Sequence, residues 1–230
     1  TFKFYRLKLS KTSLLLTLRN CGYMARIGFA TFLTELAMGV MMLSGNYMFM
    51  KMLHEEGVAA FAVACYLFPI VFSISNAVAQ SAQPIISFNY GAGQSRRVSK
   101  TLRVSVYTAI VCGIVISLGI WLSAPAITSM FLSPSETAFS LAVGGLPLFA
   151  LCAVPFALNI AFIGYYQSIE KAGAAITYTA LRGIFILVPS FMLLPVLIGV
   201  PGLWMSIPVA ETITLAIIVP VYLLTHRGKA

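Results

Sequence analysis

Long stretches without a charged residue constrain the fold of this sequence more than any other feature. No Asp, Glu, Lys or Arg occurs between Glu56 and Arg96, between Arg103 and Glu136, or between Glu136 and Glu170. Each stretch is longer than the roughly 20 apolar residues that an α-helix needs to cross the hydrocarbon core of a bilayer. Transmembrane barrel strands are shorter and alternate in polarity. The sequence therefore predicts an all-α integral membrane protein.

Composition excludes several other classes of protein. The 230 residues are 60% hydrophobic and only 9% charged, and the mean hydropathy is +0.94, whereas soluble domains are about 25% charged. A water-soluble enzyme and a disordered chain are therefore excluded. The net charge of +9 comes from Lys and Arg at the ends of apolar runs, which indicates membrane orientation rather than nucleic-acid binding. We predict no enzymatic activity, metal or cofactor, because no cluster of His, Asp or Cys is present.

The apolar runs predict six membrane-spanning helices. A basic loop at 1–26 precedes them, and a short tail at 226–230 follows. Because the chain does not begin with Met, we expect it to be a fragment of a longer protein. The spans are expected at about 27–50, 57–82, 102–124, 138–165, 176–198 and 203–225.

Turn and breaker residues refine these boundaries. Pro125 is expected to end the third span. The run Ser133-Pro134-Ser135-Glu136 predicts a capping box that begins the fourth. Pro155 is expected to kink that helix. Gly91-Ala92-Gly93 predicts a tight turn before the third.

The distribution of basic residues predicts the orientation of the bundle. Six crossings place both termini on one side of the membrane. That side carries every Lys and Arg except Lys51, whereas Glu55, Glu56 and Glu136 fall on the opposite side with Lys51. Loops rich in Lys and Arg stay in the cytoplasm. The sequence therefore predicts a multi-pass protein of the cell (inner) membrane with both termini cytoplasmic.

Two carboxylic acids, Glu35 and Glu211, lie deep inside the first and sixth spans. Ionisable groups within a membrane are costly and usually face a cavity or the interior of a bundle. We expect no Lys or Arg at a comparable depth, because Arg182 near the start of the fifth span is expected to extend its side chain to the membrane surface. Each acid either exchanges a coupling ion or is a permanently protonated hydrogen-bond donor.

Polar and methionine side chains accompany these acids at helical spacing. Methionines are flexible and polarizable, so an acid beside them suits a site for cationic, apolar compounds. The polar side chains in the other spans either join helices or line a wet cavity. The residues expected to line a substrate cavity are Met38, Met42, Asn46, Asn76, Gln80, Asn159 and Tyr166.

The run from Gln80 to Gly93, QSAQPIISFNYGAG, resembles the "QPIxxxNYGAG" signature of multidrug and toxic compound extrusion (MATE) transporters. The segments Phe32–Glu35 and Pro208–Glu211 are similar to that family as well. The resemblance implies twelve helices in two six-helix lobes with an export path between them. This chain looks like the second lobe, so an N-terminal six-helix lobe is expected upstream as its partner.

The resemblance also implies an antiporter that exports cationic amphipathic drugs, driven by inward H+ or Na+. Glu35 matches the acid of the seventh helix in the family. Many members carry an Asp in the tenth helix, but this chain has no Asp, which favours H+ over Na+. Two alternatives remain: a flippase of lipid-linked sugars from the same superfamily, and a non-transporting membrane assembly subunit. A flippase is expected to line its cavity with cationic residues, and the cavity candidates include none.

Overall fold

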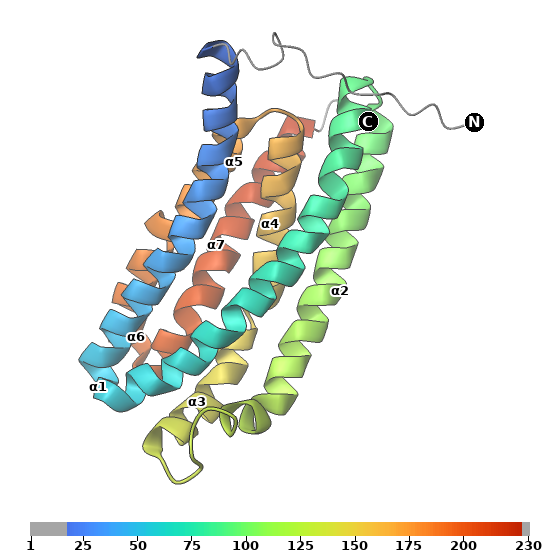
Figure 1. The fold of residues 1–230 in the computed structure, drawn as a ribbon. Helices are drawn as coiled ribbons and strands as arrows, with labels where there is room; N and C mark the ends of the chain where they lie inside the picture. Colours follow the sequence, from blue (N-terminus) through green and yellow to red (C-terminus); the bar gives the residue numbers. More distant parts are fainter. Residues whose placement is uncertain (1–17, 227–230) are drawn as a thin grey trace, which may run out of the picture.

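The computed structural model describes residues 18–226, which fold into a bundle of α-helices with one π-helical turn and no β-strand in that range (Figure 1). Residues 1–17 of the predicted basic loop and residues 227–230 of the tail lie outside the described part. The elements are α1 (Leu18–Gly91), α2 (Ser95–Thr128), α3 (Thr137–Ala150), α4 (Ala153–Ser168), α5 (Ala172–Ala180), η2 (Leu181–Phe185), α6 (Leu187–Ile198) and α7 (Val200–His226).

Helix α1 contains both the first and the second predicted spans. Its 74 residues are interrupted at His54, where φ is 56° and ψ is −150°. This backbone conformation is disfavoured for any residue other than glycine, and it turns the chain back, so that two legs, 18–53 and 55–91, meet at His54 and diverge toward the other end of the bundle (Figure 1). The apolar stretch from Phe32 to Gly91 would measure about 90 Å as one straight helix. It is therefore long enough for two crossings.

The second leg of α1 ends in the predicted turn. Gly93 has a φ of +71°, which glycine adopts at little cost, and the Gln94 amide donates to the Asn89 carbonyl at 2.8 Å. Helix α2 starts directly afterwards. It continues for one turn past Pro125 to Thr128, so Pro125 does not end it.

The predicted capping box at Ser133–Glu136 is wrong. Helix α3 starts at Thr137 and its N-cap residue, Glu136, makes no side-chain hydrogen bond to the helix. The Glu136 amide instead donates to the Ser133 carbonyl at 3.0 Å. These four residues therefore close a turn of their own, and the helix begins only after it.

The fourth predicted span is confirmed as bent. Helices α3 and α4 meet at an angle of 43° across Leu151 and Cys152. Pro155 lacks the amide hydrogen that would bond the Leu151 carbonyl, and its ring crowds that carbonyl, so the bend lies four residues before the proline. The Ser117 hydroxyl of α2 donates to the neighbouring Ala150 carbonyl. This bond satisfies a carbonyl group that faces the break.

The remaining helices complete the bundle. Helix α5 passes through η2 into α6 to form one apolar stretch, Ala172–Ile198, and α7 forms another. Four helices of the described chain are individually long and apolar enough to cross a membrane, and the bent pair α3–α4 makes a fifth. Because α1 supplies two crossings, the chain passes through the bundle six times. Helix α1 starts and α7 ends at the same end of the bundle (Figure 1).

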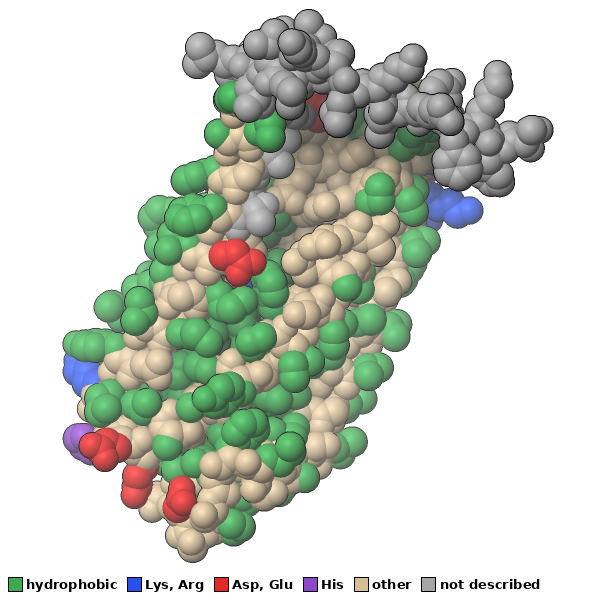
Figure 2. Space-filling view, in the orientation of Figure 1, with side chains coloured by type: hydrophobic (Ala, Val, Ile, Leu, Met, Phe, Trp, Pro, Cys, Tyr) green, Lys and Arg blue, Asp and Glu red, His purple; other side chains and the backbone are tan. Residues whose placement is uncertain are grey.

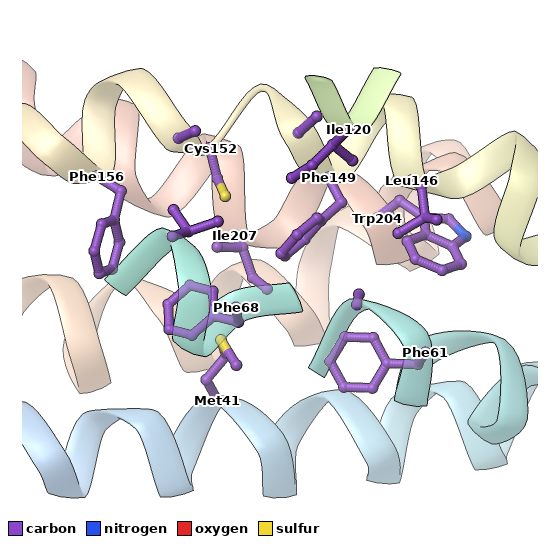
Figure 3. Packing of buried hydrophobic residues seen from close by; sticks show 14 of the residues in the cluster. Met41, Phe61, Phe68, Ile120, Leu146, Phe149, Cys152, Phe156, Trp204 and Ile207 are labelled. Carbon is purple, nitrogen blue, oxygen red and sulfur yellow. The ribbon is translucent and has the colours of Figure 1, made fainter. Parts of the chain in front are cut away.

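A large aromatic core holds the end of the bundle near His54 together. The rings of Phe49 and Phe61 stack with centroids 4.5 Å apart, and Trp204 meets Phe49 edge-on at 5.0 Å. Figure 3 shows part of this core, where side chains from α1, α3, α4 and α7 interdigitate. Elsewhere, hydrophobic side chains cover the visible surface between ends that carry most of the charge (Figure 2). This pattern fits a bundle surrounded by lipid.

Gly145 provides a test of this core. A Cβ atom added there would lie 1.9 Å from Cε2 of Trp204. We expect Gly145→Ala to displace the indole and lower the free energy of unfolding by about 1–3 kcal/mol. Thermal unfolding of the detergent-solubilised protein measures this effect. Gly144→Ala is the matched control, because nothing lies within 4 Å of its added Cβ. Equal melting temperatures for the two variants would contradict the packing described here.

Candidate functional site

A polar cavity of about 290 Å³ lies between the two legs of α1 and helix α4. The turn at His54 creates it, because Glu35 and Asn76 lie at similar distances along the two legs and so come face to face across the fold. Helix α4 closes one side, and Gly164 lets it approach closely: a Cβ there would lie 3.2 Å from the Ala79 Cβ. The polar residues around the cavity are Thr34, Glu35, Asn76, Gln80, Gln83 and Gln167.

Glu35 and the amide side chains differ in their bonding. The Gln83 amide nitrogen donates to the Gln167 side-chain oxygen at 3.0 Å, which ties the second leg of α1 to α4. Glu35 is exposed and forms no ion pair within the described residues. The structure thus brings together three predicted site residues, Glu35, Asn76 and Gln80, around one cavity. The carboxylate remains accessible to a cation.

Two residues of this cavity could have been found from the sequence. Ile160, Ile163, Gly164 and Gln167 follow one another at helical spacing on α4, and all line the cavity. Spacing of this kind places residues on one helix face. Gln83 continues the spacing of Asn76 and Gln80 on the second leg. The local signal was therefore present for Gln83 and Gln167, although nothing local indicates that the two faces meet.

The second membrane-embedded acid, Glu211, lies in a different environment. Its carboxylate is buried and pairs with Arg182, whose Nη2 is 2.7 Å from Oε1. The Arg182 Nε atom lies 3.1 Å from both carboxylate oxygens. The Asn159 side-chain amide donates to Oε2 at 2.8 Å and to the Glu211 backbone carbonyl at 2.9 Å. Three elements, α4, η2 and α7, are joined by this buried cluster.

The expectation that Arg182 extends to the membrane surface is wrong, as is the expectation that neither acid has a basic partner at its depth. Arg182 is 5% exposed, and its guanidinium carbon lies 4.3 Å from the centre of the Phe156 ring. The physical reason is that the Glu211 carboxylate lies within hydrogen-bonding distance of the guanidinium. Pairing inside the bundle leaves neither buried charge without a partner. Arg182 also lies in the π-helical turn η2, and such turns are frequent at functional sites.

A second, much smaller cavity of about 20 Å³ borders this cluster. Arg182 and Glu211 line it together with Met38, and it shares Thr34 and Phe72 with the polar cavity. The two cavities are therefore neighbours that share these two side chains in their linings. The volume is sufficient for about one water molecule.

The other predicted cavity residues lie elsewhere. Met42 is half-buried and packs against the aromatic core. Asn46 is exposed on the first leg of α1, outside the lining of the polar cavity. Tyr166 is buried among aromatic rings near the end of α4, with its ring centre 5.3 Å from that of Tyr178. Asn159 is fully buried and serves the Glu211 cluster rather than a cavity wall.

The family model of the MatE family matches residues 30–193, which is more than half of the chain. The chain belongs to the MatE family. Members of this family, the MATE transporters, are membrane transporters and not enzymes. No curated protein sequence matches the chain closely enough to count as a relative.

Solved structures show the same fold. A MATE transporter in complex with MaL6 superposes with a TM-score of 0.85 at 16% identity, over 96% of this chain and 50% of that one. An outward-facing multidrug resistance MATE transporter of the MOP superfamily gives 0.86 at 15% identity, over 96% and 49%. A MOP superfamily transporter from Pyrococcus furiosus, described as having a binding pocket of reverse polarity, gives 0.85 at 16% identity, over 96% and 50%. The chain spans about half the length of these transporters.

Proposed function

We propose that this chain is the C-terminal half of a cation-coupled antiporter that exports organic cations, and that Glu35 binds the coupling ion. The observation that supports this proposal is an accessible carboxylate, without an ion-pair partner in the described chain, beside a polar cavity within the membrane-spanning part. Such a group can bind either a cation or a proton. The N-terminal lobe, expected upstream, would supply the opposite wall of the export path.

We infer that H+ is the coupling ion in preference to Na+. A bound Na+ ion is coordinated by several oxygen atoms, and the family resemblance leads us to expect an acid on α4 among them. Helix α4 contains neither Asp nor Glu. Glu211 approaches α4 through Asn159, but Arg182 compensates its charge. Glu211 is thus a second candidate for ion coupling whose charge is already balanced, and Glu35 is the stronger one.

The experiment is ion-driven efflux by the full-length transporter in proteoliposomes. A pH gradient is expected to drive export of an organic cation, whereas a Na+ gradient at constant pH is expected to drive none. The 230-residue chain, reconstituted by itself, is expected to transport nothing, because the opposite wall of the proposed path is absent from it. Export driven only by Na+ would contradict the choice of ion. Export by this chain alone would contradict the two-lobe proposal.

A lipid-linked-sugar flippase is a second candidate, and Arg182 is the observation that favours it. A flippase needs cationic groups for anionic phosphates, and Arg182 lines the smaller cavity. Its guanidinium group is bound to Glu211, however, and stacks on Phe156. Because the positive charge is already neutralised within the bundle, the antiporter is the better interpretation. The pure assembly subunit has no observation in its favour.

We also propose that the protein lies in the cell (inner) membrane with both termini of the chain on the cytoplasmic side. The exposed bases Arg96, Arg97 and Lys100 at the start of α2 support this orientation, because loops rich in Lys and Arg stay in the cytoplasm. Single cysteines at Glu55 and Ser135, introduced into a cysteine-free background, are expected to react with an impermeant thiol reagent from outside. Cysteines at Arg96 and Lys171 are expected to react only after the membrane is opened. The reverse pattern would invert the topology.

A further inference from the structure

The amide side chains of Asn76 and Gln80 line the polar cavity, and neither makes a hydrogen bond within the described chain. Both lie on the second leg of α1, across the cavity from Glu35. Each amide offers one oxygen acceptor and two N–H donors. Gln83 and Gln167, by contrast, already bond to each other. The cavity therefore presents one carboxylate and two amide groups that are free to bind a ligand.

The methionines expected to make this site apolar are elsewhere. Met42 packs against the aromatic core, and Met38 lines the smaller cavity beside Arg182. The apolar part of the larger cavity consists of Phe72, Ala79, Ile160 and Ile163, and the polar residues lie around them. A wall of this composition recognises hydrogen-bond donors as well as positive charge.

We propose that this lobe selects cations that carry N–H donors, namely primary ammonium and guanidinium compounds, over quaternary ammonium compounds that carry none. The proposal rests on the antiporter function and names the class of its substrate. The Glu35 carboxylate would accept one hydrogen bond from the cationic group, and the oxygen atoms of Asn76 and Gln80 would accept others. A ligand with several N–H groups spread over one cationic head satisfies all three.

The preference follows from the cost of unmade hydrogen bonds. A quaternary ammonium group satisfies the charge of Glu35 but displaces water from the amides without replacing its hydrogen bonds. Displacing water from a polar group without replacing its hydrogen bonds is unfavourable, and a hydrogen bond to a charged group changes affinity by roughly tenfold or more. Sites built around hydrogen bonds reject analogues that lack them more strongly than apolar sites reject analogues of a different size.

The test compares two ligands with the same skeleton, a benzylammonium and its N,N,N-trimethyl derivative, on the full-length transporter. Binding is measured by calorimetry in detergent, and export is measured in proteoliposomes under a pH gradient. The wild type is expected to prefer benzylammonium by about tenfold or more. Asn76→Leu and Gln80→Leu are expected to remove most of that preference, because they weaken the binding of benzylammonium and leave the binding of the trimethyl derivative unchanged. Asn46→Leu, a matched change outside the cavity lining, is expected to leave the preference intact.

The two measurements separate this inference from the function on which it rests. Equal binding affinities for the two ligands, together with pH-driven export of both, would overturn the inference and leave the antiporter proposal intact. A clear binding preference without pH-driven export would support the inference and refute the antiporter. If Asn76→Leu and Gln80→Leu lower the affinity for both ligands by the same factor, or if the wild type binds neither ligand, the amides do not select for N–H donors and the inference fails.

Discussion

Glu35→Gln in the full-length transporter is expected to abolish pH-driven efflux while expression and thermal stability remain near those of the wild type. Glutamine keeps the volume of the side chain and its ability to form hydrogen bonds, but it cannot release or bind a proton. Glu35 is exposed to the polar cavity and forms no ion pair in the described chain. Its removal therefore leaves no buried charge unpaired, and the fold should not suffer. The measurement is the initial rate of cation export from proteoliposomes with an imposed pH gradient.

Two further variants make this result specific. Glu35→Asp keeps the acid about one methylene further back, so part of the activity is expected to remain. Glu55→Gln removes an exposed carboxylate at the start of the second leg of α1, directly after the turn at His54, and is expected to be neutral. If Glu35 were only a neutral hydrogen-bond donor, glutamine would replace it adequately. Wild-type export by Glu35→Gln would therefore remove this residue from the coupling mechanism.

Glu211→Gln is expected to act mainly on stability. The substitution leaves the Arg182 guanidinium buried and without a compensating charge. Removing one partner of a buried ion pair typically costs about 3–5 kcal/mol. We therefore expect a large fall in the melting temperature of the detergent-solubilised protein and poor expression. Any loss of transport should follow the loss of folded protein, in contrast to Glu35→Gln.

A double-mutant cycle distinguishes the ion pair from the individual side chains. Arg182→Met with Glu211→Leu removes both charges and keeps apolar volume, and such replacements are often neutral or stabilising. The double variant is therefore expected to be more stable than either single variant of the cycle, Glu211→Leu or Arg182→Met. If the single and double losses of stability simply add, the two residues do not interact in the folded protein. Transport by a stable double variant would further show that Glu211 is not needed for coupling.

Asn159 also contributes to the stability of the buried cluster around Glu211. Its amide nitrogen bonds both the side chain and the backbone of Glu211, so it holds α7 against α4 at the level of the ion pair. Asn159→Ala removes two hydrogen bonds but no charge. Asn159→Ala should therefore lower the free energy of unfolding by less than Glu211→Gln does, because an uncompensated charge in a buried site costs more than an absent amide.

The sequence by itself determined the membrane-spanning helices, because length and hydrophobicity are local properties that a bilayer selects directly. The charge-free stretches around the second, third and fourth spans correspond to the second leg of α1, to α2, and to α3 with α4. The bend near Pro155 was also predictable, since a missing amide acts within four residues. The spacing of Asn76 and Gln80 likewise placed both on one helix face before any fold was known.

Only the tertiary structure decided which of these local features meet. Glu211 pairs with Arg182, 29 residues away, and with Asn159, 52 residues away, and no local spacing connects three helices at one depth. The sequence therefore assigned Arg182 to the membrane surface, although a buried carboxylate within reach held it inside. In the same way, the turn at His54 brought Glu35 opposite the amides, because a single residue with positive φ sets how the two legs of α1 face each other. Helix composition is local, whereas the pairing of charges and the shape of a cavity depend on how helices pack.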